Sequence, residues 1–283
     1  MWQGKIMNVA TTLVTGASSG IGMHLARQFA EHGHPLVLVA PVQAELERVA
    51  AELHTAHNVE IQVIAKDLRE PQAPQEIYDT LQANGTTIEI LVNDAGHGRY
   101  GQFWEIPLDD EISMLRLNVE AVLRMLKLFV PPMVQRRHGR VLNVASVAGF
   151  EPGPRLAVYH ATKAFVLSLN ESLATELEDT SVTMTALCPG PTDTDFFPKA
   201  QMLDTRAFQQ SNLMAPQEVA EAGYKGLMAG DRIVVPGGIN KAMVFSRRML
   251  TKSAQARFNQ KLYERTKPSA RRRSRGDKEA KAA

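Results

Sequence analysis

The stretch T-G-A-S-S-G-I-G, residues 15–22, joins a run of aliphatic residues to a segment with helical periodicity. Gly16 permits a tight turn, the missing side chain of Gly20 lets a phosphate approach the backbone, and Gly22 lets the following helix pack closely. The N-terminus of that helix offers unpaired N–H groups to a pyrophosphate. The stretch predicts a dinucleotide-binding turn. A plain strand-to-helix turn is the alternative, because three glycines alone are a weak signal.

Seven short apolar runs alternate with longer segments of helical periodicity along the chain. Near-continuous apolar runs are typical of strands that are buried on both faces of a parallel sheet. The alternation predicts an α/β fold, a Rossmann-type doubly wound parallel sheet of about seven strands with helices on both faces, in one domain over residues 1–240. The expected strands are residues 6–15, 34–40, 59–65, 88–93, 140–145, 182–188 and 232–236.

The composition is that of an ordinary globular protein, with 44% hydrophobic and 22% charged residues. Cys188 is the single cysteine, so no internal disulfide can form and we expect a reducing, cytoplasmic setting. The cysteine and histidine residues show no zinc-ligand spacing, and we expect no metal site. No uninterrupted apolar stretch reaches the roughly 18 residues that span a bilayer.

Basic residues gather at the C-terminus. Residues 266–283 hold seven basic and two acidic side chains, so they carry +5 while the chain as a whole carries +2. We expect residues 241–283 to form a basic amphipathic helix and a disordered tail. The helix would pack on its own domain or touch an anionic membrane surface weakly. No aromatic residues interleave the tail's basic residues, so we expect no specific nucleic-acid partner.

The segment Y-H-A-T-K places Tyr159 and Lys163 one helical turn apart, on the same helix face. An ammonium group near a phenol favours the phenolate, so we expect Lys163 to lower the pKa of Tyr159 from ~10 toward neutrality. Tyr159 could then exchange protons during catalysis. A surface Tyr–Lys pair of little energetic weight is the alternative. His160 lies about 100° around the helix from Tyr159, and we assign it no catalytic role.

An ordered set of motifs resembles the short-chain dehydrogenase/reductase family over about residues 8–240. The set begins with T-G-x-x-x-G-x-G at residues 15–22 and N-D-A-G at residues 93–96, where the family has N-N-A-G. It continues with Asn118, Ser146, Y-x-x-x-K at residues 159–163 and P-G-x-x-x-T at residues 189–194. The resemblance implies an NAD(P)-dependent oxidoreductase that transfers a hydride between a nicotinamide cofactor and a carbonyl or alcohol. A catalytically silent dinucleotide-binding sensor or scaffold of the same fold is the alternative.

The resemblance also implies roles for individual residues. Tyr159 exchanges a proton with the substrate oxygen, and Lys163 tunes Tyr159 and hydrogen-bonds the nicotinamide ribose. Ser146 holds the substrate oxygen, and Asn118 supports a water that links Lys163 to solvent. The implied cofactor-binding residues are Gly16, Ser18, Ser19, Gly20, Ile21, Gly22, Asp67, Leu68, Asn93, Ala95, Gly96, Tyr159, Lys163, Pro189, Gly190, Thr192 and Thr194.

Two cofactor positions depart from the family pattern. Asp94 stands where the family has Asn, and a carboxylate cannot donate the hydrogen bonds of an amide, which puts support of that loop in doubt. Ala40 and Pro41 stand where an acidic residue would select NAD or an arginine would select NADP. The residues of other motifs in the chain resemble those of NADP-dependent members of the family, so we expect NADP(H) rather than NAD(H). Arg48 is the candidate for the cation, by proximity in sequence alone.

Residues 191–216 lack clean periodicity and form a candidate substrate lid. The lid contains Phe196, Phe197, Met202, Leu203 and Phe208. These residues would line a site for a hydrophobic substrate or would only pack the lid onto the core.

A long helix is expected over residues 109–137, and Pro131 and Pro132 should kink it or end it early. Members of the family commonly pair their long fourth and fifth helices. The apolar run over residues 115–130 is compatible with such a homodimer or homotetramer.

Overall fold

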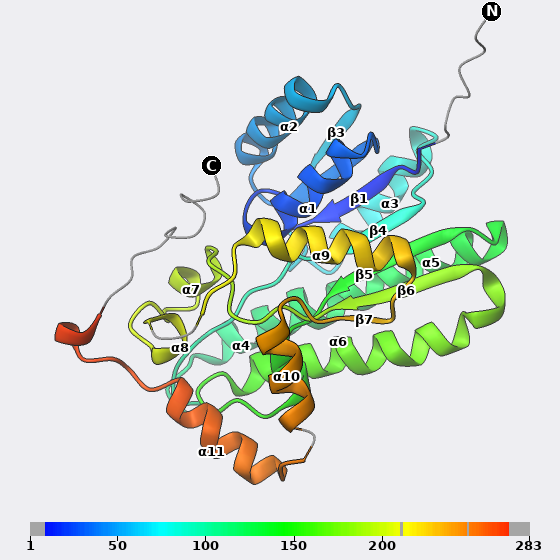
Figure 1. Cartoon of the computed structure of the whole chain (residues 1–283). Helices are drawn as coiled ribbons and strands as arrows, with labels where there is room; N and C mark the ends of the chain where they lie inside the picture. The colour runs from blue at the N-terminus through cyan, green and yellow to red at the C-terminus, as the bar shows by residue number, and fades with distance from the viewer. Residues whose placement is uncertain (1–8, 210–211, 248, 272–283) are drawn as a thin grey trace, which may run out of the picture.

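The computed structural model describes residues 9–209, 212–247 and 249–271, and its centre is one parallel sheet of seven strands (Figure 1). The strands are β1 Thr12–Thr15, β2 Leu36–Ala40, β3 Ile61–Ala65, β4 Ile90–Asn93, β5 Gly139–Val144, β6 Val182–Leu187 and β7 Ile233–Val234. Their order across the sheet is β3-β2-β1-β4-β5-β6-β7, and every pair is parallel. The predicted seven-stranded Rossmann-type fold is confirmed.

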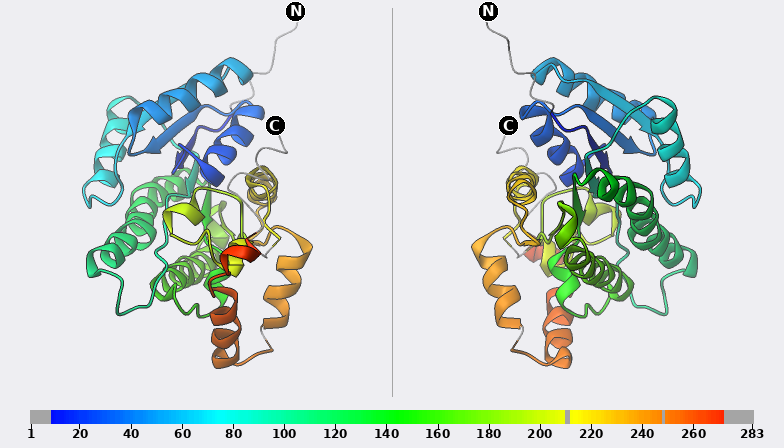
Figure 2. Two further views of the ribbon diagram at one scale, coloured as in Figure 1. Left: turned by 90° about the vertical axis from the view of Figure 1, so that its left-hand side faces the viewer. Right: turned by 90° about the vertical axis from the view of Figure 1, so that its right-hand side faces the viewer.

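Helices cover both faces of the sheet (Figures 1 and 2). They are α1 Gly20–Glu31, α2 Gln43–His57, α3 Ala73–Ala83, α4 Leu108–Leu115, α5 Val122–Arg136, α6 Ala157–Glu176, α7 Phe196–Lys199, α8 Arg206–Gln209, α9 Pro216–Ala229, α10 Gly238–Arg247 and α11 Lys252–Leu262. Short turns η1 Arg116–Ala121, η2 Val147–Phe150, η3 Glu178–Thr180 and η4 Pro268–Ala270 complete the set.

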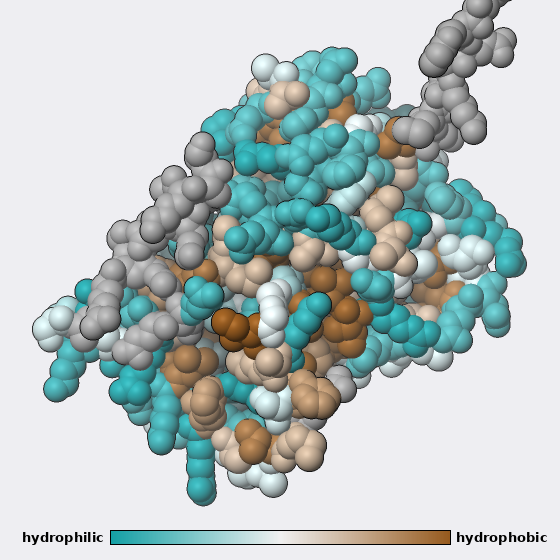
Figure 3. Space-filling model, viewed as in Figure 1, coloured by the Kyte–Doolittle hydropathy of each residue, from teal (hydrophilic) through white to brown (hydrophobic). Residues whose placement is uncertain are grey.

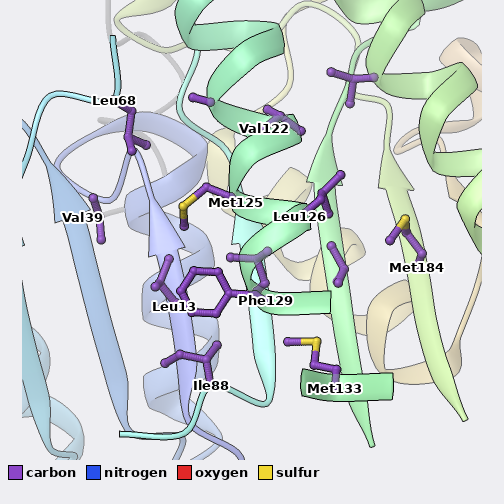
Figure 4. Close-up of a cluster of buried hydrophobic side chains, with 14 of the residues drawn as sticks. Leu13, Val39, Leu68, Ile88, Val122, Met125, Leu126, Phe129, Met133 and Met184 are labelled. Atoms are coloured by element: carbon purple, nitrogen blue, oxygen red, sulfur yellow. The ribbon is translucent and has the colours of Figure 1, made fainter. Parts of the chain in front are cut away.

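Two apolar clusters form the core, one on each face of the sheet. On one face α1, α2 and α9 bury side chains such as Phe29 and Leu46. On the other face α3, α5 and α6 do the same, and Figure 4 shows Phe129 and Met125 of α5 against Leu13 of β1. Because both faces are covered, the strands need apolar side chains in both directions, which explains their near-continuous apolar sequences.

The chain changes direction across the sheet between β1 and β4. β1 pairs with β2 on one side and with β4 on the other, so the connections leaving β1 and β4 diverge to opposite faces. Ligands of open parallel sheets bind at such a switch point, outside the carboxyl ends of the strands. The glycine turn after β1 and the N-D-A-G segment after β4 both lie at this point.

The expectation that Pro131 and Pro132 would end the long helix early is wrong. The helical path runs from α4 through the π-helical turn η1 into α5, which contains both prolines and continues to Arg136. Phe129 and Met133 flank the prolines and are buried, at 3% and 0% exposure. We infer that this packing outweighs the hydrogen bonds that the prolines remove.

The C-terminal segment, defined here as residues 238–271, forms two helices, α10 and α11, where a single helix was expected. The expected disordered tail lies mostly outside the described residues, which end at Arg271. None of the helices in the described ranges is long and apolar enough to cross a membrane.

Candidate active site

A cleft of about 1050 Å³ opens at the carboxyl ends of the strands, at the switch point between β1 and β4. It runs from the glycine turn and the ends of β2 and β3, past the ends of β4 and β5, to the lid and the C-terminal segment. Of the residues predicted from the sequence, Gly16, Ser18, Ser19, Gly20, Ile21, Asp67, Leu68, Ala95, Gly96, Ser146, Tyr159, Lys163, Pro189, Gly190, Thr192 and Thr194 line it.

The glycine turn has the geometry that phosphate binding requires. Gly16 and Gly20 adopt φ of +69° and +58°, a region that side-chain-bearing residues rarely occupy. A Cβ atom at Gly20 would meet only the Thr194 side chain, at 3.5 Å, so the backbone there is open. The N-cap of α1, Ser19, makes no side-chain capping hydrogen bond. The N-terminus of α1 is therefore suited to a pyrophosphate, and the residues present fit a dinucleotide.

Three residues predicted from the sequence do not line the cleft: Gly22, Asn93 and Asn118. Gly22 serves close packing, since a Cβ atom there would lie 2.4 Å from the Gly16 carbonyl oxygen. The Asn93 side-chain amide donates to Asn143 Oδ1 over 2.9 Å inside the sheet. Its side chain instead ties β4 to β5.

Asn118 is buried beneath the loop after β4. It accepts from the His97 amide over 3.0 Å and donates to the His97 carbonyl over 2.9 Å and to Thr162 Oγ1 over 3.1 Å. A Cβ atom at Gly96 would lie 3.1 Å from Asn118 Oδ1 and 3.5 Å from Lys163 Nζ. Asn118 and Lys163 therefore approach each other around Gly96, while the amide of Asn118 itself holds the loop.

Two elements, β5 and α6, bring Ser146, Tyr159 and Lys163 together. Ser146 follows β5, where its Oγ accepts from the Ala148 amide over 3.1 Å. Tyr159 and Lys163 project from α6 into the same cleft. Lys163 Nζ donates to the Val144 carbonyl over 2.8 Å and lies 5.9 Å from the centre of the Tyr159 ring. The shared helix face that the sequence predicted is present.

The predicted effect of Lys163 on Tyr159 is wrong for this structure. Burial raises the pKa of Tyr159 to about 12, and the neighbouring Ser146 hydroxyl offsets only part of that rise. Burial likewise lowers the pKa of Lys163 to about 8, although the Asp94 carboxylate favours the ammonium form. Desolvation of both groups thus outweighs the attraction that sequence spacing suggested.

The loop after β4, which contains Asp94 instead of the family's Asn, is supported by Thr15 at the end of β1. Thr15 Oγ1 accepts from the amides of Asp94 and Ala95, over 3.0 and 3.2 Å. Burial raises the pKa of Asp94 to about 7, opposed by Lys163 and by a hydrogen bond from the Gly22 amide. The carboxyl group therefore contacts the N-terminal turn of α1 and interacts electrostatically with Lys163.

The ends of β2 and β3 lie side by side, and the Lys66 amide donates to the Ala40 carbonyl over 3.0 Å. Lys66 and Arg69 line the cleft with Ala40 and Pro41. Asp67, the predicted adenine partner, lines it too, and its carboxylate accepts from the Arg69 guanidinium over 2.5–3.0 Å. These hydrogen bonds hold the pKa of Asp67 below its usual range.

The sequence-based candidate Arg48 is misplaced. It is exposed on α2, pairs with Glu52 at 3.7 Å and is not among the cleft's lining residues. Lys66 and Arg69 were missed, and the signal that could have found them is the pairing of β2 with β3. This pairing brings the residue after β3 beside the position that discriminates the two cofactors.

The family model described as short chain dehydrogenase matches residues 10–203. The chain belongs to the short-chain dehydrogenase/reductase family. It is an oxidoreductase, and no comparison supports the sensor or scaffold alternative.

Individual relatives agree with this membership. The chain is 33% identical to oxidoreductase UcpA of Escherichia coli (strain K12) over 210 residues, 74% of this chain and 76% of the relative. A short-chain dehydrogenase from Sphingobium yanoikuyae in complex with NADPH superposes with a TM-score of 0.77 at 31% identity, covering 85% and 94% of the two chains. A family member from Burkholderia phymatum in complex with NAD gives 0.77 at 25% identity, covering 85% and 93%.

The lid both packs and lines the cleft. Phe196, Phe197 and Met202 line the cleft, and the Phe196 ring lies 5.0 Å from the Tyr159 ring. Phe208 is fully buried in a small separate cluster that also includes Phe197 and Met202. Leu203 is 39% exposed and is not among the residues that line the cleft. Some residues of this segment thus form the cleft wall, while others only pack inside the cluster.

The C-terminal segment lies outside residues 10–203, which the family model matches, and it forms another wall of the cleft. Arg247, Phe258, Leu262 and Tyr263 contribute to it, and Tyr263 and Leu262 also pack against the lid cluster. The Arg247 guanidinium forms a buried ion pair with Glu151, from the loop before α6. The helical periodicity of this segment predicted packing on the domain but carried no sign of a role at the site.

Proposed function

We propose that this enzyme transfers a hydride between NADP(H) and a small-to-medium hydrophobic ketone, aldehyde or alcohol. The observation that carries the proposal is the convergence of Ser146, Tyr159 and Lys163, from two elements, on a cleft that begins at the glycine turn. A dinucleotide extended from that turn would bring its nicotinamide end toward these three side chains.

We assign the proton steps to residues of this chain. During reduction the Tyr159 hydroxyl donates its proton to the substrate oxygen, and during oxidation it removes the hydroxyl proton. The Ser146 hydroxyl donates a hydrogen bond to the same oxygen and orients it. The Lys163 ammonium group binds the ribose hydroxyls of the cofactor. The bound nicotinamide supplies the hydride chemistry.

The walls of the substrate half favour an apolar substrate. Leu156, Phe196, Phe197, Met202 and Leu262 line the cleft around Tyr159. Burying apolar substrate surface against such walls favours binding by roughly 25 cal/mol per Å². It also excludes water from the hydride transfer. The physiological substrate is therefore expected among hydrophobic carbonyl compounds or alcohols.

The choice of NADP(H) over NAD(H) rests on charge at the ends of β2 and β3. Lys66 and Arg69 line the cleft beside Pro41, where the adenosine ribose of the cofactor is expected. Both cations have carboxylate partners, Glu76 and Asp67 respectively, and Glu45 lines the same region. A 2′-phosphate brings at least one further negative charge, and we expect Lys66 and Arg69 to bind it.

The test is turnover of aryl and alkyl ketones, aldehydes and alcohols with each cofactor. We expect Tyr159→Phe to lower turnover at least ~10²-fold, the low end of what a positioned proton donor contributes. Melting temperature and NADPH affinity of the variant serve as controls for folding. Equal turnover by wild type and Tyr159→Phe would remove Tyr159 from the mechanism.

We also propose that the enzyme assembles as a homodimer or homotetramer through α4 and α5. Leu108, Ile112, Leu115 and Leu123 are exposed on this helical region, at 73%, 36%, 40% and 38%. A second copy of the chain would cover these side chains. Sedimentation equilibrium measures the oligomeric state directly, and a monomer at micromolar concentration would contradict the proposal.

A weak membrane-surface contact of the C-terminal segment is a further proposal on partners. Figure 3 shows apolar side chains in the part of the surface where α10 and α11 lie. Ile239, Phe245, Met249 and Phe258 are 72%, 72%, 84% and 54% exposed there. Basic side chains such as Lys261 accompany them. Sedimentation with anionic vesicles tests the contact, and no pelleting at low salt would contradict it.

A further inference from the structure

His160, the residue after Tyr159, is buried and held by two hydrogen bonds. Its Nδ1 lies 2.7 Å from the backbone carbonyl oxygen of Glu151, and its Nε2 lies 2.9 Å from the hydroxyl oxygen of Tyr263. A carbonyl oxygen can only accept, so Nδ1 must carry a hydrogen. Burial lowers the pKa of His160 to about 4, which keeps the ring neutral near pH 7. Nε2 is therefore bare and can only accept.

The tautomer of His160 dictates the direction of the hydrogen bond to Tyr263. Because Nε2 accepts, the Tyr263 hydroxyl must donate its single hydrogen to His160. Burial raises the pKa of Tyr263, so the hydroxyl remains protonated. The hydroxyl oxygen has no other hydrogen to offer, and only its lone pairs are left for a second partner.

Tyr263 is held rigidly at the cleft. The Tyr100 hydroxyl donates to its backbone carbonyl over 2.7 Å, and its ring packs edge-on against His160 with the ring centres 5.7 Å apart. Tyr263 lines the cleft together with Tyr159, Leu156 and Leu262. Arg247 and Glu151 also line the cleft but form an ion pair with each other. The hydroxyl oxygen of Tyr263 can therefore help to fix the orientation of a ligand beside the apolar side chains.

We propose that Tyr263 is a specificity-determining residue whose hydroxyl oxygen accepts a hydrogen bond from a second, non-reacting hydroxyl group of the substrate. The inference deepens the proposed function and rests on it. The substrate class is a bulky apolar ketone or alcohol that carries an additional hydroxyl away from the reacting carbon. A substrate with an ether oxygen in that place has no hydrogen to donate to the Tyr263 oxygen. The lone pairs of the two oxygens would repel each other, and the substrate would bind more weakly.

Matched aryl ketones test the proposal. The probes are benzophenone, its 3- and 4-hydroxy derivatives and the corresponding methoxy derivatives, bound to the enzyme saturated with NADP⁺. We expect wild type to bind at least one hydroxy ketone about five-fold more tightly than its methoxy counterpart, the size of one net hydrogen bond. Tyr263→Phe should abolish this preference. Titration calorimetry measures each dissociation constant.

Two further variants separate a direct contact from a structural effect. His160→Leu removes the acceptor that holds the Tyr263 hydrogen, so the hydroxyl becomes free to donate and the preference should shift toward the methoxy ketone. Tyr100→Phe removes another hydroxyl that anchors the same segment, but Tyr100 does not line the cleft. Tyr100→Phe should keep the wild-type preference for the hydroxy ketone over the methoxy ketone. The melting temperature of each variant shows whether it is folded.

The outcomes are distinct from those that test the proposed function. Equal affinities for hydroxy and methoxy ketones in wild type, a preference that survives Tyr263→Phe, or binding of none of the ketones would each overturn the role of Tyr263. Turnover of other hydrophobic carbonyls that depends on Tyr159 would leave the proposed function standing in each case.

Discussion

Lys163 donates a hydrogen bond to the backbone carbonyl oxygen of Val144 over 2.8 Å, and Val144 is the last residue of β5. The ammonium group is thus held at the carboxyl end of β5, near the loop after β4, in the wall of the cleft. Its charge is stabilised by a carboxyl group, that of Asp94, which replaces the family's usual amide. The charge of Lys163 is therefore linked to the protonation state of Asp94.

Asp94→Asn should shift the pH dependence of turnover. Lys163 can act as a cation only below its pKa, which burial lowers to about 8 and which the Asp94 carboxylate raises. Removing the carboxylate lowers this pKa further, so the fall in rate on the alkaline side should begin at a lower pH in the variant. Rate–pH profiles from pH 5 to 10 measure the shift. Glu52→Gln, which removes an exposed carboxylate of α2, is the control, and an unshifted Asp94→Asn profile would exclude the coupling.

Gly22→Ala should destabilise the fold and weaken cofactor binding together. The new Cβ atom would lie 2.4 Å from the Gly16 carbonyl oxygen and 2.6 Å from Asp94 Oδ2, so α1 must move away from the turn. We expect a loss of about 1–3 kcal/mol in the free energy of unfolding, the usual cost of overpacking. Urea denaturation measures it. Gly238→Ala has no neighbour within 4 Å of the new atom and should show no such loss.

Lys66→Ala should reduce selectivity for NADPH over NADH. One charge-assisted hydrogen bond to a phosphate contributes about 1.5–3 kcal/mol, so NADPH should bind about 10- to 100-fold more weakly while NADH affinity changes little. Fluorescence titration with both cofactors measures this. Arg48→Ala is the matched control, since Arg48 lies on the exposed side of α2 and should leave both affinities unchanged. Equal losses for NADPH and NADH would contradict the 2′-phosphate contact.

Glu151→Gln should loosen the C-terminal segment. Arg247 and Glu151 have side chains that are only 7% and 5% exposed, and Arg247 Nη1 also donates to Asn259 Oδ1 over 2.9 Å. Removing one partner of a buried pair leaves an uncompensated charge, at a cost of about 3–5 kcal/mol. We expect faster amide hydrogen exchange throughout residues 238–271 and a higher KM for hydrophobic substrates.

The control for the buried pair is Asp204→Asn, a change in residues 191–216 that removes the partner of two exposed arginines near the end of the C-terminal segment. Asp204 is 22% exposed in its side chain and pairs with Arg265 and Arg271, which are 65% and 46% exposed. Exposed pairs contribute at most about 1 kcal/mol, so hydrogen exchange should change little. Equal acceleration in both variants would mean that burial of the Arg247 pair is not what holds the segment.

Local signals in the sequence were sufficient for the architecture of this protein. The apolar runs predicted all seven strands, because a strand covered on both faces must be apolar in both directions. The first run was expected to start at residue 6, but β1 starts at Thr12, and residues 6–8 lie outside the described residues. The glycine turn and the spacing of Tyr159 and Lys163 were equally informative. Each depends on backbone geometry within a few residues, which the order of residues encodes directly.

Other features came only from how distant segments pack. The contact of Tyr263 with His160 joins residues 103 positions apart, and Lys66 reaches the cofactor region through the pairing of β3 with β2. Burial likewise moved the pKa of Tyr159 upward, opposite to the direction expected from its spacing to Lys163. Periodicity tells which face of an element is buried but not which partner covers it. Contact partners and desolvation are therefore properties of the folded chain rather than of any short stretch of it.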